Sequence, residues 1–123
     1  MDRRLFVLWL ACAGVTVLSP SRAFAHAFLE HADPPVGGTV SQSPKDIRLW
    51  FSEPVEPRFS KVTVTAESPP QILTPPVTRD PNDAREIVVS LPVLPAGRYK
   101  VSWRVISVDT HETEGAFTFE VKP

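Results

Sequence analysis

The chain has 123 residues, with 13 lysines and arginines against 14 aspartates and glutamates, and a formal net charge of −1 at pH 7. This length suits one domain, and the balanced charge without a basic patch argues against nucleic acid and anionic membrane surfaces as partners. Cys12 is the only cysteine, so an intramolecular disulfide is excluded.

The first 25 residues have the layout of a cleaved export signal. Two arginines precede an apolar run over 5–18, and Ala23 and Ala25 are the small residues that a signal peptidase reads. The apolar run is too short and wrongly flanked for a transmembrane helix. We therefore expect a signal peptide over 1–25 that is removed during export.

Cleavage after Ala25 would leave a mature domain of residues 26–123 that begins at His26. This part has 98 residues, 10 basic and 13 acidic side chains, a formal charge of −3 and no cysteine. We expect one periplasmic domain, not inserted in the membrane, that is stabilised by its own core and by metal where a metal binds. The alternative is an uncleaved anchor, in which His26 is an ordinary surface residue.

Short stretches of alternating apolar and polar residues follow one another through the mature part. Such alternation predicts strands with one buried face and one wet face. The stretches are 47–51, 62–64, 87–91, 99–105 and 117–121, and turn signals stand at 34–38, 52–54, 69–70, 75–76, 80–83 and 95–97. The prolines leave no room for a long helix. About seven short strands in roughly 100 residues predict an all-β domain, a small Greek-key β-sandwich or barrel.

Both ends of the mature chain carry residues that suit a metal. A terminal His26 offers two nitrogens, the α-amine and the imidazole Nδ1, which close a six-membered chelate ring. The amine must lose its proton to bind, and a pKa of about 7.7–8.0 makes this inexpensive. Asp109 and His111 are two residues apart, so both side chains would point to the same side if the strand ending near Val108 stays extended through them.

Together these residues would supply three nitrogens and one oxygen. Tetragonal coordination by nitrogen and oxygen suits Cu(II) better than the tetrahedral ligand sets that zinc prefers. The soft sulfur ligands that hold Cu(I) are missing from the mature chain, because Met1 and Cys12 leave with the signal. We therefore predict a Cu(II) site at His26, Asp109 and His111.

Other candidate residues have plainer interpretations. A lone Asp-x-His is usually a loop feature. Glu53 ends a strand, where it is either a turn carboxylate or a neighbour of the metal, as a weak ligand or a hydrogen-bond partner to one. His31 has the opposite strand parity to His26, so we expect it on the surface and away from the site. Trp50 and Trp103 are expected to be packing residues rather than a binding platform.

The mature chain resembles the copper resistance protein C (CopC) family. The resemblance rests on the segments 26–35 with Gly37, 49–55, 96–111 and 115–121. It implies a periplasmic copper-binding β-sandwich of cupredoxin-like or Ig-like form, with His26, Asp109 and His111 as Cu(II) ligands and Glu53 as a nearby participant. Some members carry a methionine-rich segment that binds Cu(I) at a second site, whereas residues 64–77 contain neither Met nor His. Compared with those members, this chain is therefore expected to have a single Cu(II) site.

Three functions remain open. The resemblance favours a protein that is not an enzyme and that sequesters or carries Cu(II) in copper resistance or homeostasis, with delivery to an inner-membrane copper importer of the CopD type. A terminal histidine with a second histidine is also the copper brace of lytic polysaccharide monooxygenases, although Asp109 would occupy a position that redox chemistry needs open. A metal-free accessory β-sandwich is the third, if the chain is not cut before His26.

Overall fold

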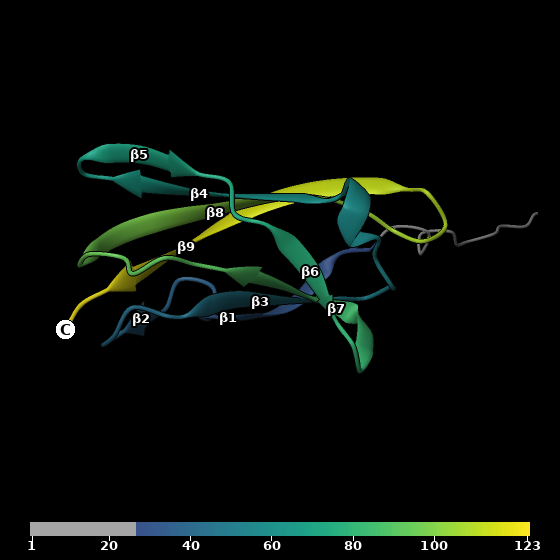
Figure 1. Cartoon of the computed structure of the whole chain (residues 1–123), viewed down its shortest axis with the longest axis horizontal. Helices are drawn as coiled ribbons and strands as arrows, with labels where there is room; N and C mark the ends of the chain where they lie inside the picture. Colours follow the sequence, from purple (N-terminus) through teal and green to yellow (C-terminus); the bar gives the residue numbers. More distant parts are fainter. Residues whose placement is uncertain (1–26) are drawn as a thin grey trace, which may run out of the picture.

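Two β-sheets packed face to face make up the part of the chain that the structure describes, residues 27–123 of a computed structural model (Figure 1). The predicted signal peptide and His26 lie outside the described residues. The four-stranded sheet has the order β1-β3-β7-β6, and the five-stranded sheet has the order β2-β9-β8-β4-β5. The predicted all-β sandwich is confirmed.

The strands are short and are joined by turns and a single-turn 3-10 helix. Their bounds are β1 (Leu29–Asp33), β2 (Thr39–Val40), β3 (Asp46–Phe51), β4 (Lys61–Glu67), β5 (Pro70–Leu73), β6 (Val77–Asp80), β7 (Asp83–Ser90), β8 (Gly97–Ile106) and β9 (Glu112–Val121), with the 3-10 helix η2 at Pro57–Phe59. The pairs are antiparallel except β2 with β9, which is parallel. The chain crosses repeatedly between the sheets, as Greek-key connections require.

Strand β8 confirms the alternation predicted over 99–105. Tyr99, Val101, Trp103 and Val105 are buried, while the residues between them lie on the outer face. The inward side chains of both sheets form one core, in which the fully buried members include Ile47, Leu49, Phe51, Val55, Val62, Val64, Ile87, Val89, Val101 and Val105. Each such side chain stabilises the fold by about 1.5–3 kcal/mol relative to an exposed position. This core replaces the disulfides that the chain lacks.

The described residues hold nine strands rather than about seven. The difference lies mainly in β5 and β6, which occupy a proline-rich stretch with turn signals at 69–70 and 75–76. Each of these strands is an edge strand of its sheet. Proline is tolerated at the first residue of an edge strand, because no ladder partner needs its missing N–H. The prolines therefore mark edges here, and not only turns.

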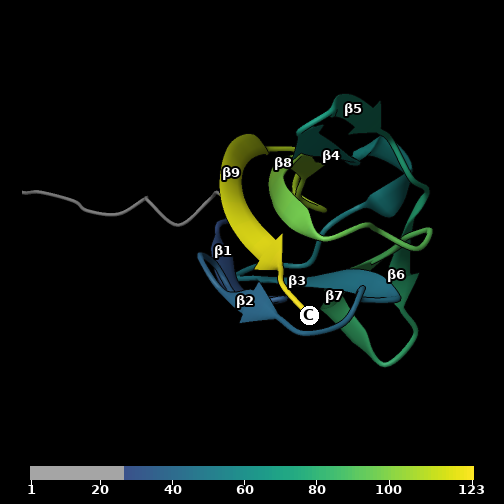
Figure 2. The same cartoon turned by 90° about the vertical axis from the view of Figure 1, so that its left-hand side faces the viewer.

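One end of the sandwich gathers three segments that are far apart in sequence. The turn between β8 and β9, the helix η2 and the beginning of the described chain lie at this end, and the C-terminus lies at the other (Figure 1). Seen from the C-terminal end, β1 and β2 lie on the same side of the sandwich as β9 (Figure 2), and β2 pairs with β9. Within 27–123 no helix has the length and apolar character needed to span a membrane.

Candidate metal centre

The segment that carries Asp109 and His111 is a tight turn and not an extended strand. Strand β8 ends at Ile106 and β9 begins at Glu112, and the Thr110 N–H donates to the Ser107 carbonyl at 2.8 Å. Thr110 has φ 71°, in the left-handed region that β-branched residues rarely adopt. The expectation of an extended strand through Asp109 is therefore wrong, because the chain reverses here to start β9.

The turn nevertheless brings the two predicted ligands together. His111 Nδ1 lies 3.3 Å from Asp109 Oδ1, and the side chains are 45% and 50% exposed. Two ligand atoms at about 2.0 Å from one metal ion, in neighbouring positions, are separated by about 3 Å. The observed spacing and exposure therefore fit a metal ion bound by both side chains.

Asp109 is held in its charged form. The Ser107 hydroxyl donates a hydrogen bond to Asp109 Oδ1. This bond, followed by the contact with His111, lowers the pKa of the Asp109 carboxyl below its usual value. An ionised carboxylate beside an imidazole is a suitable donor pair for a divalent cation.

The start of the described chain is fastened beside this turn. Ala27 is fully buried, and its carbonyl accepts a hydrogen bond from Thr113 Oγ1 at 2.6 Å. The Phe28 N–H donates to Ser52 Oγ at 3.0 Å, and the Ser52 N–H donates to the Phe28 carbonyl at 2.9 Å. Thr113 is two residues from His111, so Ala27, which directly follows His26, lies at the end of the sandwich that carries the ligand pair.

Glu53 lies in the bend after β3 and is partly exposed. Its loop is joined to the turn at 107–111, which carries Asp109 and His111 and is called the ligand turn below. The Val108 N–H donates to the Pro54 carbonyl at 3.0 Å. Among residues 27–123, however, no three His, Cys, Asp or Glu side chains come together as a metal site. The described chain thus supplies Asp109 and His111 as a pair, without Glu53 as a third member.

His31 and the two tryptophans lie as the sequence predicted. His31 is exposed on β1, where its ring centroid lies 4.6 Å from that of Trp50 on β3. Trp103 is buried in the core, edge-on to Phe51 with centroids 5.2 Å apart. Trp50 is only half-buried and packs on the outer face, so it is a packing residue outside the core.

The residues that sequence reasoning missed are hydroxyl side chains around the pair. Ser52 and Thr113 fasten the start of the chain, and Ser107 holds the ligand turn. Serine and aspartate are both frequent turn residues, so the sequence could have indicated a turn at 107–111. The burial of Ser107 and its hydrogen bonds to Asp109 and His111 depend on packing that the sequence pattern does not reveal.

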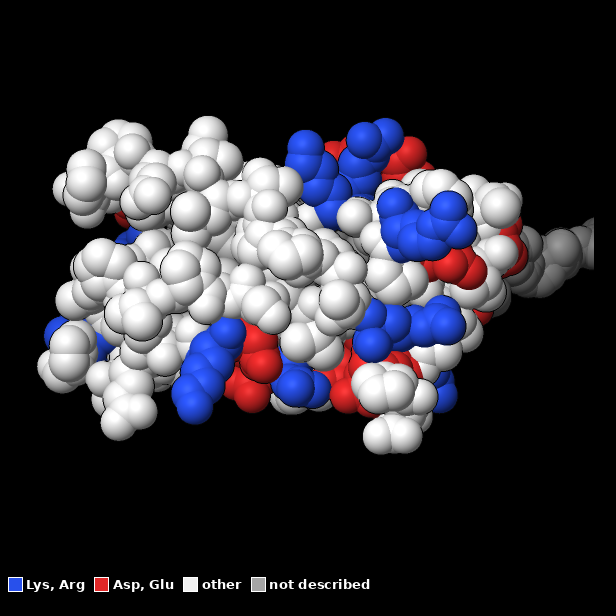
Figure 3. Space-filling model, viewed as in Figure 1, with Lys and Arg blue, Asp and Glu red and all other residues white. Residues whose placement is uncertain are grey.

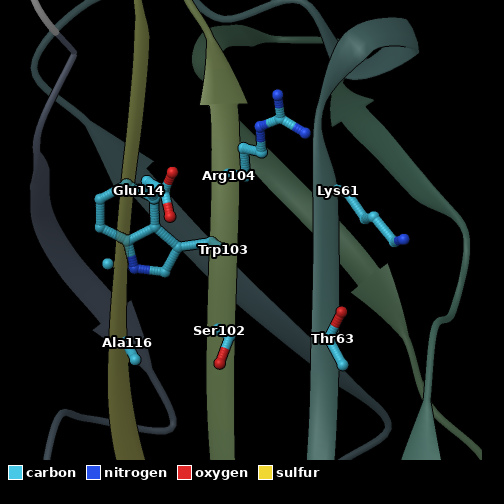
Figure 4. A pocket seen from close by; sticks show the side chains of 8 residues that line it. Lys61, Thr63, Ser102, Trp103, Arg104, Glu114 and Ala116 are labelled. Atoms are coloured by element: carbon cyan, nitrogen blue, oxygen red, sulfur yellow. The ribbon is translucent and has the colours of Figure 1, made fainter.

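A separate shallow hollow lies on the outer face of the five-stranded sheet (Figure 4). Lys61 and Thr63 line it from β4, Arg104 from β8 and Glu114 from β9. The Arg104 guanidinium is already paired, with Nε 2.5 Å from a carboxylate oxygen of Glu112. On the face seen in Figure 3, basic and acidic side chains likewise lie beside one another, so that face carries no continuous basic surface.

The fold and the ligand pair define a small two-sheet β-sandwich with metal-donor side chains at one end. Comparison with known families identifies this class further: the family model for the CopC domain matches residues 29–122, and the chain belongs to that family. The predicted family is confirmed.

Relatives connect the family with copper. The chain is 40% identical over 114 residues to protein YobA of Escherichia coli K12, covering 92% of this chain and 91% of YobA. It is 34% identical over 128 aligned positions to copper resistance protein C of Pseudomonas syringae pv. tomato, covering 99% and 98% of the two chains. A match of 25% identity to the copper transport protein CutJ of Bacillus subtilis covers 92% of this chain but 21% of CutJ.

Solved structures agree with these relatives. CopC from Methylosinus trichosporium OB3b has a TM-score of 0.74 and 33% identity, covering 80% of this chain and 95% of that one. PcoC from Escherichia coli, described as a methionine-rich copper resistance protein, has a TM-score of 0.67 and 32% identity, covering 80% of this chain and 100% of PcoC. Together the comparisons support a copper-related function for the chain.

Proposed function

We propose that the protein binds one Cu(II) ion through His26, Asp109 and His111 and acts as a periplasmic copper carrier or buffer. The observation that carries the proposal is the 3.3 Å approach of His111 Nδ1 to Asp109 Oδ1. Support comes from Ala27, whose carbonyl accepts from Thr113 at the same end of the sandwich. A chain cut after Ala25 would place its first amine and imidazole one residue before this anchor.

The donor chemistry favours the oxidised metal. An amine, two imidazoles and a carboxylate are nitrogen and oxygen ligands, which suit Cu(II), whereas Cu(I) selects thiolate and thioether sulfur. The chain has one methionine and one cysteine, Met1 and Cys12, both within the proposed signal peptide. The relative PcoC is described as methionine rich. This chain is proposed to have a single site, for Cu(II) alone.

Binding and release suit the position of the site better than catalysis does. Asp109 and His111 are about half exposed, so a partner protein has direct access to the ligands. The carboxylate would fill a coordination position that a copper oxidase needs for its co-substrate. An inner-membrane importer is the proposed recipient, since a segment matching this chain forms 21% of the copper transport protein CutJ.

The test begins with the mature N-terminus. Sequencing or intact mass of the exported protein should show a chain that starts at His26. Cu(II) affinity is then measured by competition with a chelator for the mature protein, for His26→Ala and for a form with one residue added before His26. Changes to outer-shell residues typically lower metal affinity by about 10–100-fold. Removing a direct ligand is expected to lower the Cu(II) affinity by more than this.

His31→Ala is the matched control, because His31 packs on Trp50 on the outer face of β1 and β3. This variant should keep the affinity of the parent protein. If the exported chain begins elsewhere, or if neither change at His26 weakens Cu(II) binding, the proposed site is wrong. Reductant-dependent oxidation of a polysaccharide by the copper-loaded protein would instead favour an enzyme.

A further inference from the structure

Ser107 is an unusual residue for a sandwich of this size, because it is polar and almost completely buried. It is 1% exposed, and Glu86 is the other buried polar or charged residue within 27–123. Buried hydroxyls are retained where their hydrogen bonds are made. The partners of Ser107 therefore indicate what the residue does.

Each of these partners belongs to the ligand turn. The Ser107 hydroxyl donates to Asp109 Oδ1 and accepts from the His111 N–H at 3.2 Å. The Ser107 N–H donates to the His111 carbonyl at 2.9 Å, and its carbonyl accepts from the Thr110 N–H at 2.8 Å. One residue thus holds the carboxylate of the first ligand and the backbone of the second.

Ser107 is itself fixed from the core side. It pairs with Val55 in an isolated antiparallel bridge, and Val55 is fully buried. Ile106, which precedes it, ends β8 and pairs with Glu112 on β9. The turn is therefore attached to the core of the sandwich at Val55 and to the β8–β9 pairing, and these contacts help to hold Thr110 in its left-handed conformation.

We infer that Ser107 is a positioning residue for the metal site. It orders the Asp109 carboxylate and the His111 backbone before copper arrives, so that binding does not have to order the turn. This inference rests on the proposed copper site and adds to it a residue that does not touch the metal. Outer-shell partners of this kind orient ligands and strengthen metal binding.

Ser107→Ala removes the hydroxyl while leaving the backbone bonds in place. We expect the Cu(II) affinity of the mature protein, beginning at His26, to fall by about tenfold or more. Ser60→Ala is the matched control, since the Ser60 hydroxyl donates to the Glu56 carbonyl at 2.8 Å and accepts from the Ile106 N–H at 3.1 Å. Ser60 lies at the same end of the sandwich, and its hydroxyl bonds to neither Asp109 nor His111. The Cu(II) affinity of the Ser60→Ala protein should stay within about twofold of that of the parent.

A double-mutant cycle separates positioning from a general structural effect. If Ser107 acts through the Asp109 carboxylate, Ser107→Ala should weaken binding in the parent but much less in the Asp109→Ala background. Ser107→Thr, which keeps a hydroxyl, should recover part of the affinity. Equal losses in both backgrounds, or a Ser107→Ala protein that binds like Ser60→Ala, would overturn the inference.

The same experiment distinguishes failure of the copper site from failure of the inference. If Asp109→Ala and His111→Ala bind Cu(II) like the parent, the proposed site is wrong and the role of Ser107 is overturned with it. If both weaken binding while Ser107→Ala does not, only the role of Ser107 is wrong. Thermal unfolding of each metal-free variant verifies that it is folded.

Discussion

At the scale of single residues, hydrogen bonds order the proposed ligand pair, Asp109 and His111. The Asp109 carboxylate lies between the Ser107 hydroxyl and the His111 ring, and both contacts lower its pKa. The charge is therefore present before a metal binds. This arrangement has consequences for stability in acid and for the backbone of Thr110.

Asp109→Asn should make the stability of the metal-free protein less sensitive to acid. The folded-state pKa of Asp109 lies below its ordinary value of 3.8, so the folded protein binds fewer protons at this group than the unfolded chain does. The group thus adds stability above about pH 4 that is lost as the pH falls through the lowered pKa. Urea unfolding between about pH 5 and pH 2 should show a steeper fall for the parent than for the variant. Parallel curves would contradict this.

Thr110 should tolerate asparagine better than valine. Its φ of 71° is unfavourable for a β-branched residue, and its hydroxyl donates to the Asp109 carbonyl at 2.5 Å. Thr110→Val keeps the branched shape but loses the hydrogen bond, and should destabilise the fold by about 1 kcal/mol. Asparagine is far more readily accommodated in the left-handed region. Thermal unfolding should place Thr110→Asn at or above the parent, and the reverse order would show that the turn relaxes.

At the scale of elements, the β8–β9 hairpin connects the core to the ligand turn. These strands pair without interruption from Gly97 with Val121 to Ile106 with Glu112. Within the hairpin, Trp103 faces Gly115 across the pair, and its ring covers the place where a side chain at 115 would stand. The absence of a side chain at 115 is therefore a packing requirement.

Gly115→Ala should destabilise the protein by about 1–3 kcal/mol. The added Cβ would lie 2.5 Å from Trp103 Cζ2 and 2.9 Å from Cε2. The indole cannot withdraw easily, because it is 8% exposed and packs edge-on against Phe51. Thermal unfolding should show a midpoint lower by at least about 4 °C, with a changed near-ultraviolet circular dichroism of Trp103. Ala116→Ser, at the neighbouring exposed position, should leave both unchanged; an unchanged Gly115→Ala protein would contradict the packing argument.

At the scale of the whole molecule, the parts predictable from sequence are those set by local pattern. Alternation over 99–105 and 117–121 predicted β8 and β9, because burial of one strand face leaves a period of two in the residues. The edge strands β5 and β6 were not predicted, because the prolines at 69–70 and 75–76 were interpreted as turn signals. The ligand turn was misjudged because a left-handed threonine is rare and Ser107 depends on its distant partner Val55. Donor type and spacing together selected Asp109 and His111, which lie side by side in the structure. Their metal binding stays a prediction, as does that of His26, which lies outside the described residues.

Copper binding should stabilise the folded protein as a whole while tightening mainly one end of it. A ligand that binds only the folded state, present at a free concentration of about 100 times its dissociation constant, adds about 2.7 kcal/mol to the free energy of unfolding. For a domain of this size, this corresponds to a rise of roughly 10 °C or more in the unfolding midpoint. Because the proposed site joins the start of the chain to the β8–β9 turn, hydrogen exchange measured by mass spectrometry should slow around Ala27–Leu29 and over 107–113. The turn between β4 and β5, which lies at the opposite end of the sandwich (Figure 1), should change little. Protection that is greatest at the β4–β5 turn would place the metal elsewhere. Removal of copper by a chelator without a fall in the unfolding midpoint would contradict specific binding of copper to the folded state.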